Sequence, residues 1–181
     1  MAGRPLIAFA AAICTLLGFA AFQNARSDVE GWREIAWPFS RDGWPTGRAF
    51  KCAAALCGDE IELYLRPKAG FCNCDTGVAD DEEVDRVTDI DLITERFAPH
   101  EPGNAVRVAG MAGRLRTYDL AMPDGARRAA VGIAVSRRCD LFVAVAQGHG
   151  NGSHVRHVAL DFLGSTGMEK WMIASMDGAP H

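Results

Sequence analysis

Residues 51–91 decide the fold of this chain, and their sequence is KCAAALCGDEIELYLRPKAGFCNCDTGVADDEEVDRVTDID. The stretch holds four of the six cysteines and the densest run of acidic residues in the chain. In residues 61–66, IELYLR, every second side chain is aliphatic. This period of two predicts a half-buried β-strand, which Pro67 is expected to close.

A helix is predicted directly after the cysteine-containing loop. Asp80 and Glu83 have the spacing of an N-cap and its reciprocal partner in a capping box. Apolar residues then recur at helical intervals, so we predict a helix over residues 81–97. Residues 89–93 alternate instead, and this is the point at which the helix can break.

The acidic residues around this helix start allow two interpretations. A solvated first turn, favoured by the helix dipole, is the simpler one. A site for Ca²⁺ or another hard cation is the alternative, although the ligand spacing of an EF-hand is absent. The acidic residues are Asp75, Asp80, Asp81, Glu82, Glu83 and Asp85.

The rest of the chain predicts more strands and one further main helix. Residues 34–39 predict a short strand, 106–120 a hairpin, and 129–135 and 141–146 two central strands. Apolar residues at helical spacing predict a helix over 154–163. Short turns cannot make parallel crossovers, so the expected fold class is α+β: a mostly antiparallel sheet covered by two main helices.

The N-terminus has the pattern of an export segment. Residues 6–22 are uncharged and almost wholly apolar, and they follow a positively charged start. Their length lies on the border between a signal peptide and a membrane-spanning helix. We interpret residues 1–26 as a signal-anchor or transmembrane segment and linker, with cleavage after Ala20 as the alternative. Both place residues 27–181, a single domain, in the periplasm, on the outer side of an inner membrane.

Composition restricts the classes of partner. The 181 residues carry a formal net charge of −4, and the basic residues are scattered. A nucleic-acid-binding protein normally shows a clustered basic face, so nucleic acid is set aside. No nucleophile elbow, P-loop or zinc-protease motif occurs, so we expect no cofactor and favour a binding role over an enzyme.

Cysteines of the exported domain are expected to form disulfides, because the compartment is oxidising. The candidates are Cys52, Cys57, Cys72, Cys74 and Cys139. We predict two bridges, at least one joining the first pair to the second, with a bridge within the first pair as the main competitor. A metal site built from the first four and a redox role are the alternatives, although the usual zinc spacing and C-x-x-C are absent.

A second candidate site lies in HGNGSHVRH, which contains His149, His154 and His157. The last two are three residues apart and would share a helix face, an arrangement that metals use. The alternative is a polar loop leading into an exposed helix start, since no carboxylate follows nearby until Asp161.

Two functional hypotheses result. The first is a membrane-tethered extracytoplasmic binding or accessory domain, stabilised by disulfides, whose partners are other envelope proteins. The alternative is an extracytoplasmic metal- or thiol-handling protein that uses the cysteines or the three histidines.

Overall fold

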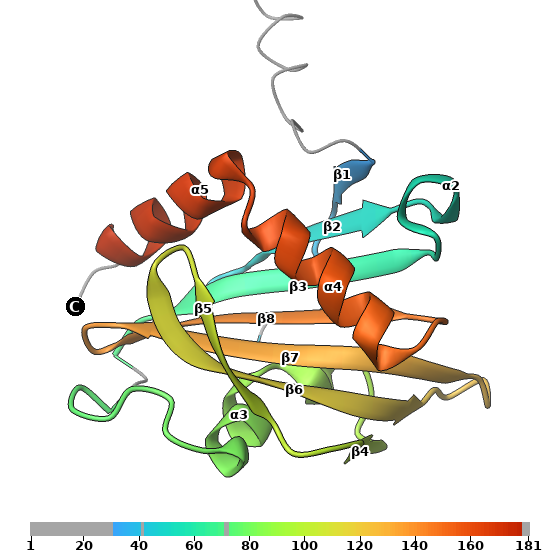
Figure 1. Ribbon diagram of the computed structural model, residues 1–181, viewed down its shortest axis with the longest axis horizontal. Helices are drawn as coiled ribbons and strands as arrows, with labels where there is room; N and C mark the ends of the chain where they lie inside the picture. Colours follow the sequence, from blue (N-terminus) through green and yellow to red (C-terminus); the bar gives the residue numbers. More distant parts are fainter. Residues whose placement is uncertain (1–30, 41, 71–72, 179–181) are drawn as a thin grey trace, which may run out of the picture.

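The computed structural model describes residues 31–40, 42–70 and 73–178, which form one antiparallel sheet with helices on both faces (Figure 1). The strands are β1 (Trp32–Ile35), β2 (Arg48–Cys52), β3 (Ile61–Lys68), β4 (Phe97–Pro99), β5 (Asn104–Val108), β6 (Met111–Ala121), β7 (Arg127–Arg137) and β8 (Asp140–Gly148). The helices are α2 (Ala54–Cys57), α3 (Asp81–Val87), α4 (Gly152–Leu163) and α5 (Thr166–Asp177), with a 3-10 turn η1 (Ile90–Leu92).

The sheet runs in the order β1-β2-β3-β8-β7-β6-β4, and β5 also pairs with β6. All its pairings are antiparallel, which confirms the predicted α+β class. The predicted hairpin is β5–β6, and the two predicted central strands are β7 and β8. Every residue of β8 is buried, because β8 lies between β3 and β7 and both faces of the sheet are covered.

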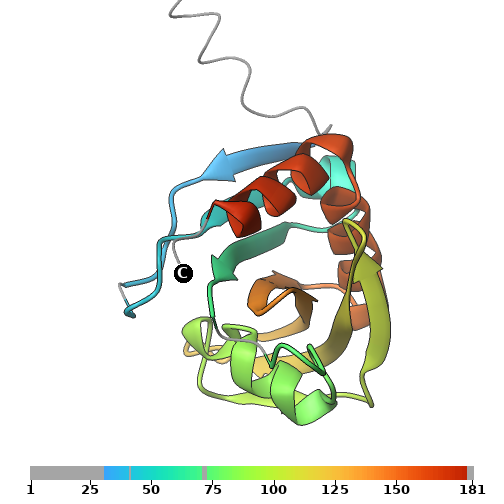
Figure 2. The same ribbon diagram turned by 90° about the vertical axis from the view of Figure 1, so that its left-hand side faces the viewer.

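Opposite faces of the sheet carry different helices. Helices α4 and α5 lie on one face, and α3 lies on the other (Figure 2). The aliphatic positions of β3 point toward α4 and α5, where they join the main core with Phe50, Phe142 and Met172. The alternate positions, including Tyr64, pack on the face that α3 and the segment after β1 cover. The predicted alternation of faces is therefore confirmed, but the strand is not half-buried as predicted, because Tyr64 and Arg66 on the second face are buried as well.

Strand β3 does not end at Pro67, as the sequence predicted. It continues to Lys68, and Pro67 pairs with Phe142 of β8. Strand β2 begins at Arg48, opposite Leu65, so beyond Leu65 β3 has a paired neighbour on one side only. Proline is tolerated there because its missing N–H can face the unpaired side.

The predicted helix over 81–97 is wrong beyond Val87. Asp89 has a left-handed backbone with φ of 30°, which ends the helical path, and the short turn η1 follows. Phe97 instead begins β4 and pairs with Leu120. The second long helix of the domain is α5, which packs beside α4.

The signal-anchor segment predicted over residues 1–26 lies outside the described residues. Among the residues that the structure describes, no helix is long and apolar enough to cross a membrane. The predicted strand over 34–39 is shifted toward the N-terminus, since β1 covers Trp32–Ile35.

Candidate functional site

The chain forms a fixed corner where β8 leads into α4. Asn151 caps α4, because its side chain accepts a hydrogen bond from the His154 N–H at 2.8 Å. Asp59, just before β3, accepts a hydrogen bond from the Gly150 N–H. A Cβ atom at Gly148 would lie 2.8 Å from the Asp59 carboxylate, so glycine is needed where these segments meet. The glycine-rich sequence therefore builds a tight, hydrogen-bonded turn.

Beside this corner lies an open cavity of about 250 Å³. Its polar lining comes from the segment after β4, from β6 and β7, and from the corner itself. We call it the β8–α4 pocket, and the residues that define it here are His100, Asp119, Arg127, Arg128, His149 and Asn151.

Charge in the β8–α4 pocket is mainly positive. Arg127 and Arg128 are successive residues of β7, and Asp119 of β6 is the carboxylate on the lining. Asp119 lies 3.2 Å from the Nδ1 of His100, and both side chains are more than half exposed. His149 lies 3.9 Å from the Asp59 carboxylate, outside hydrogen-bonding distance. At neutral pH the two arginines therefore outweigh the single carboxylate of the lining.

A buried polar cluster lies on the adjoining strands β3 and β8. The Tyr64 hydroxyl donates to Glu62 at 2.6 Å, and the Gln147 amide donates to the same carboxylate oxygen at 3.1 Å. Burial raises the pKa of Glu62, but hydrogen bonds from Tyr64 and Lys51 outweigh it, so its pKa is lowered overall. The charge of Arg128 adds to this lowering. Glu62 is therefore held as a carboxylate near the guanidinium of Arg128.

Two polar atoms near this cluster are buried without a hydrogen-bond partner among the described residues. One is the Nε donor of Arg128, and the other is the Oε1 acceptor of Gln147. Buried polar groups are nearly always hydrogen-bonded, and an unsatisfied charged donor is costly. The Arg128 donor is notable because its residue also lines the β8–α4 pocket.

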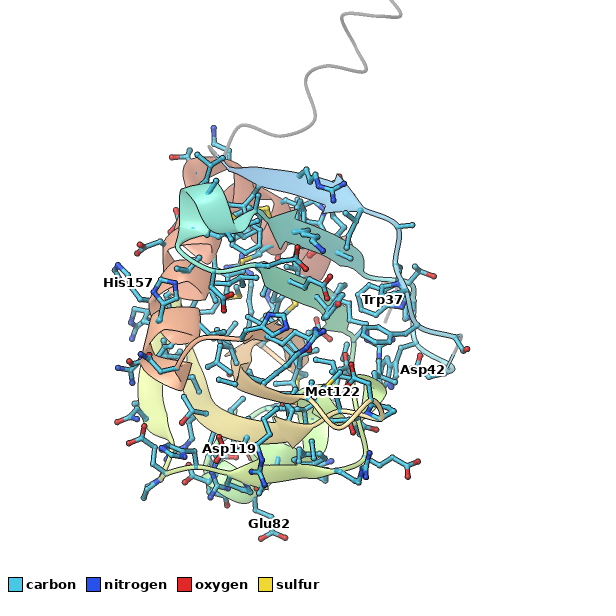
Figure 3. All side chains as sticks on the ribbon, turned by 90° about the vertical axis from the view of Figure 1, so that its right-hand side faces the viewer. Trp37, Asp42, Glu82, Asp119, Met122 and His157 are labelled. Carbon is cyan, nitrogen blue, oxygen red and sulfur yellow. A yellow bond between two sulfur atoms is a disulfide. The ribbon has the colours of Figure 1, made fainter. Side chains whose placement is uncertain are left out.

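The three histidines considered as a candidate metal site are not brought together. His149 lines the β8–α4 pocket, whereas His154 and His157 line a second cavity of about 450 Å³ between α2 and α4. His154 contacts the Cys57 carbonyl through Nε2 at 2.8 Å. Figure 3 shows His157 on the outer side of α4, away from Asp119. Within residues 31–40, 42–70 and 73–178, no group of three or more His, Cys, Asp or Glu side chains is placed to hold a metal.

Two disulfides form, as predicted, but the predicted pairing is wrong. Cys52 bonds to Cys57, and Cys74 bonds to Cys139. Cys52 lies opposite Ile61, the first residue of β3. The loop that contains Cys74 follows the last residue of β3, so the eight residues of this strand lie between the two groups of cysteines. At about 3.3 Å per residue the strand separates the two groups far beyond the reach of one bridge.

The same pairing argues against the alternative of a four-cysteine metal site. Three of its four ligands are bonded in disulfides, so they are not thiolates. The fourth, Cys72, lies outside the described residues.

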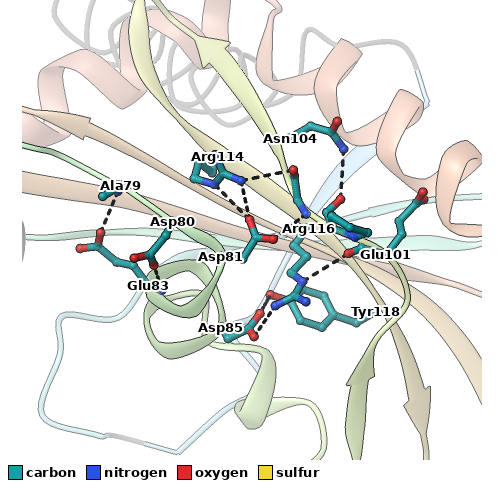
Figure 4. A network of polar contacts seen from close by, with 12 residues as sticks. Ala79, Asp80, Asp81, Glu83, Asp85, Glu101, Asn104, Arg114, Arg116 and Tyr118 are labelled. Atoms are coloured by element: carbon teal, nitrogen blue, oxygen red, sulfur yellow. Dashed lines mark hydrogen bonds and ion pairs between the residues drawn. The ribbon is translucent and has the colours of Figure 1, made fainter.

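The acidic run fastens α3 to the sheet (Figure 4). Asp81 accepts hydrogen bonds from Arg114, and Asp85 accepts them from Arg116 and the Tyr118 hydroxyl. The predicted capping box is present in altered form. Asp80 accepts from the Glu83 N–H as expected, but the Glu83 carboxylate reaches the N–H of Ala79 instead of that of Asp80. Much of the run is therefore used in structural contacts.

Sequence reasoning missed Arg127, Arg128, His100 and Asp119. They come from separate segments that carry no shared motif. The glycine-rich stretch around His149 was the one signal that marked this corner.

Comparison with known proteins assigns no family. No family model matches the chain, and no curated protein matches it. Among solved structures, a Pseudomonas aeruginosa protein of unknown function, PA94, is similar over 83% of this chain and 97% of that one. The two share 14% sequence identity with a TM-score of 0.42, a level of likeness that assigns no function to this chain.

Proposed function

We propose that this protein is an extracytoplasmic binding domain, tethered to the inner membrane by residues 1–26, that holds a small polar ligand in the β8–α4 pocket. The observation that carries the proposal is that two arginines, Arg127 and Arg128, line the pocket, and neither has an ion-pair or side-chain hydrogen-bond partner among the described residues. Its protein partners would be other envelope proteins, which share the compartment.

Two disulfides support the location. Such bonds form and persist in oxidising compartments and are rare in the cytoplasm. A reporter that is active only outside the cytoplasm, fused after His181, should be active. Activity of a cytoplasmic reporter at the same position would argue against export.

Ligand binding is tested by blocking the pocket without changing its charges. Ala129 is a partly buried residue of β7 on the pocket lining, so Ala129→Phe should fill the space. Ala105→Phe, at an exposed position of β5, is the matched control. The measurement is thermal unfolding of the purified full chain against a set of small polar metabolites.

A ligand present at about a hundred times its Kd should stabilise the protein by about 2.7 kcal/mol. We expect such a compound to raise the Tm of the wild type and of Ala105→Phe, but not that of Ala129→Phe. Compounds that stabilise all three proteins equally would place binding elsewhere and contradict the proposal. The proposal would also be contradicted if no metabolite of the set raised the Tm of the wild type.

A further inference from the structure

We propose that the ligand of the β8–α4 pocket is an oxyanion, the carboxylate or phosphate end of a small organic molecule, and that Arg128 is its main ligand. This inference rests on the proposed function and specifies its ligand class. A volume of about 250 Å³ leaves room for more than the anionic group itself.

Arg128 carries the first step of the argument. Its Nε is buried, and among the described residues it donates to no acceptor. The nearby Glu62 carboxylate is already used by Tyr64, Gln147 and Lys51. A guanidinium presents its donors in a fork that matches carboxylate and phosphate oxygens. No described residue accepts a hydrogen bond from the Arg128 guanidinium, and Arg128 lines the pocket, so this guanidinium is available to an oxyanion there.

Neighbouring charges favour an anion over a cation or a neutral ligand. Arg127 adjoins Arg128, and His100 and His149 lie on the same lining. Among the described residues of the lining, Asp119 is the one carboxylate, and the two arginines outnumber it. The pocket lining therefore carries a net positive charge, which attracts an anionic ligand.

The start of α4 also favours an anionic ligand in the pocket. Helix α4 has 12 residues, and Gly152, its first residue, lines the pocket. Asn151 satisfies the N–H of His154, which is one of the four free N–H groups at a helix start. The remaining groups and the helix dipole favour negative charge at this end.

The experiment is a titration of the isotope-labelled full chain, followed by NMR at constant ionic strength. Inorganic phosphate and acetate are the probes, and sodium chloride is the reference salt. Arg128→Met keeps the apolar stem but removes the donors, Arg128→Lys keeps the charge, and Arg33→Met changes an exposed arginine of β1 as the control.

We expect phosphate or acetate to shift the amide signals of Gly150 and Gly152 in the wild type and in Arg33→Met. Arg128→Met should bind at least about tenfold more weakly, and Arg128→Lys should fall between. Which probe binds more tightly distinguishes a phosphate from a carboxylate ligand. If Arg128→Met does not fold, equal binding by wild type and Arg128→Lys would overturn the role of Arg128.

Failure of this inference can be told from failure of the proposed function. If neither anion shifts these amides more than chloride does, the oxyanion assignment is overturned. If a neutral metabolite then stabilises the wild type but not Ala129→Phe, the pocket still binds a ligand. If no compound separates those two proteins, both proposals fall.

Discussion

Arg66 is the largest fully buried side chain of the domain, and its charge is matched within the fold. Its guanidinium donates to both oxygens of Asp89 at 2.7 and 2.8 Å, and Lys68 donates to the same carboxylate at 2.6 Å. Asp42 binds the outer side of Arg66, and Trp37 lies over its guanidinium at 5.5 Å. Asp89 therefore bridges two buried cations, with Asp42 as the second carboxylate on Arg66, and fixes the end of α3 against β3.

Replacing Asp89 should lower the free energy of unfolding far more than replacing Asp42, the other carboxylate on Arg66. Asp89→Asn keeps the size of the side chain and tolerates the left-handed backbone, but leaves two cations buried without their common partner. We expect a loss of about 3–5 kcal/mol in the free energy of unfolding. Asp42→Asn, at a side chain that is 27% exposed, should cost less, about 1.5 kcal/mol, because Arg66 keeps Asp89 as a partner. Urea unfolding measures both, and equal losses would show that Asp89 is not the centre of the cluster.

Both tyrosines of the chain are expected to resist ionisation. Burial, followed by the hydrogen bond to a carboxylate, raises the pKa of Tyr64 and of Tyr118 well above the usual 10. The folded state therefore favours the neutral phenol. This contribution to stability is complete below about pH 10 and is lost as the pH rises toward the raised folded pKa.

A spectrophotometric titration of tyrosinate absorbance measures this directly. The folded chain should show no ionisation near pH 10, and both phenols should ionise only above that range, together with unfolding. The chain unfolded in urea is the control, and its tyrosines should titrate near 10. A normal titration with the fold intact would contradict both the burial of the two phenols and their hydrogen bonds to Glu62 and Asp85.

Helix α3 is held by charge as well as by apolar contacts. Asp81 and Asp85 bind two arginines of β6, while Val84 and Val87 are buried beneath the helix. Replacing both carboxylates by Asn should cost about 1.5–3 kcal/mol, the range for hydrogen bonds to charged groups. Hydrogen exchange should become faster in α3 and stay unchanged in β7 and β8, because local opening involves the weakest element first.

The matched control removes two exposed acidic residues of the same run, Asp75 and Glu82, as Asn and Gln. It changes the net charge equally without touching β6. If the control accelerates exchange in α3 as much as the double variant does, general repulsion rather than these contacts governs the helix.

Elements with strong internal patterns were predictable from sequence, and elements that depend on distant partners were not. Strands β7 and β8 contain continuous apolar runs, helix α4 has a helical period, and all three lie where the sequence predicted them. Strand β2 was missed, because five residues carry little pattern and its place depends on pairing with β3. Helix α3 was predicted too long, because Asp89 ends it through contacts with β3 that are remote in sequence.

The candidate site follows the same rule. The corner at His149 was marked by its glycines, but Arg128 joins it through the register of β7 between β6 and β8. Nothing in the local sequence around residue 128 indicates that its Nε is buried without a partner. Such a feature appears only when the strands are paired.

On the scale of the whole molecule, the two disulfides fasten opposite ends of β3. Cys52–Cys57 closes a turn next to α2, with a sequence separation of 5. Cys74–Cys139 ties the loop after β3 to the β7–β8 turn, with a separation of 65. In the chain-entropy account the longer loop contributes more, about 4 kcal/mol or more. Such staples suit a domain that works outside the cytoplasm.

Peptide mapping without reductant, on the full chain isolated from its own cell envelope, tests the central claim of an exported, disulfide-closed domain most directly. We expect one linked peptide that contains Cys52 and Cys57 and another that joins Cys74 to Cys139. Recovery of these four cysteines as free thiols would contradict both the fold's bridges and the compartment. A peptide joining Cys52 or Cys57 to Cys74 would contradict the pairing described here.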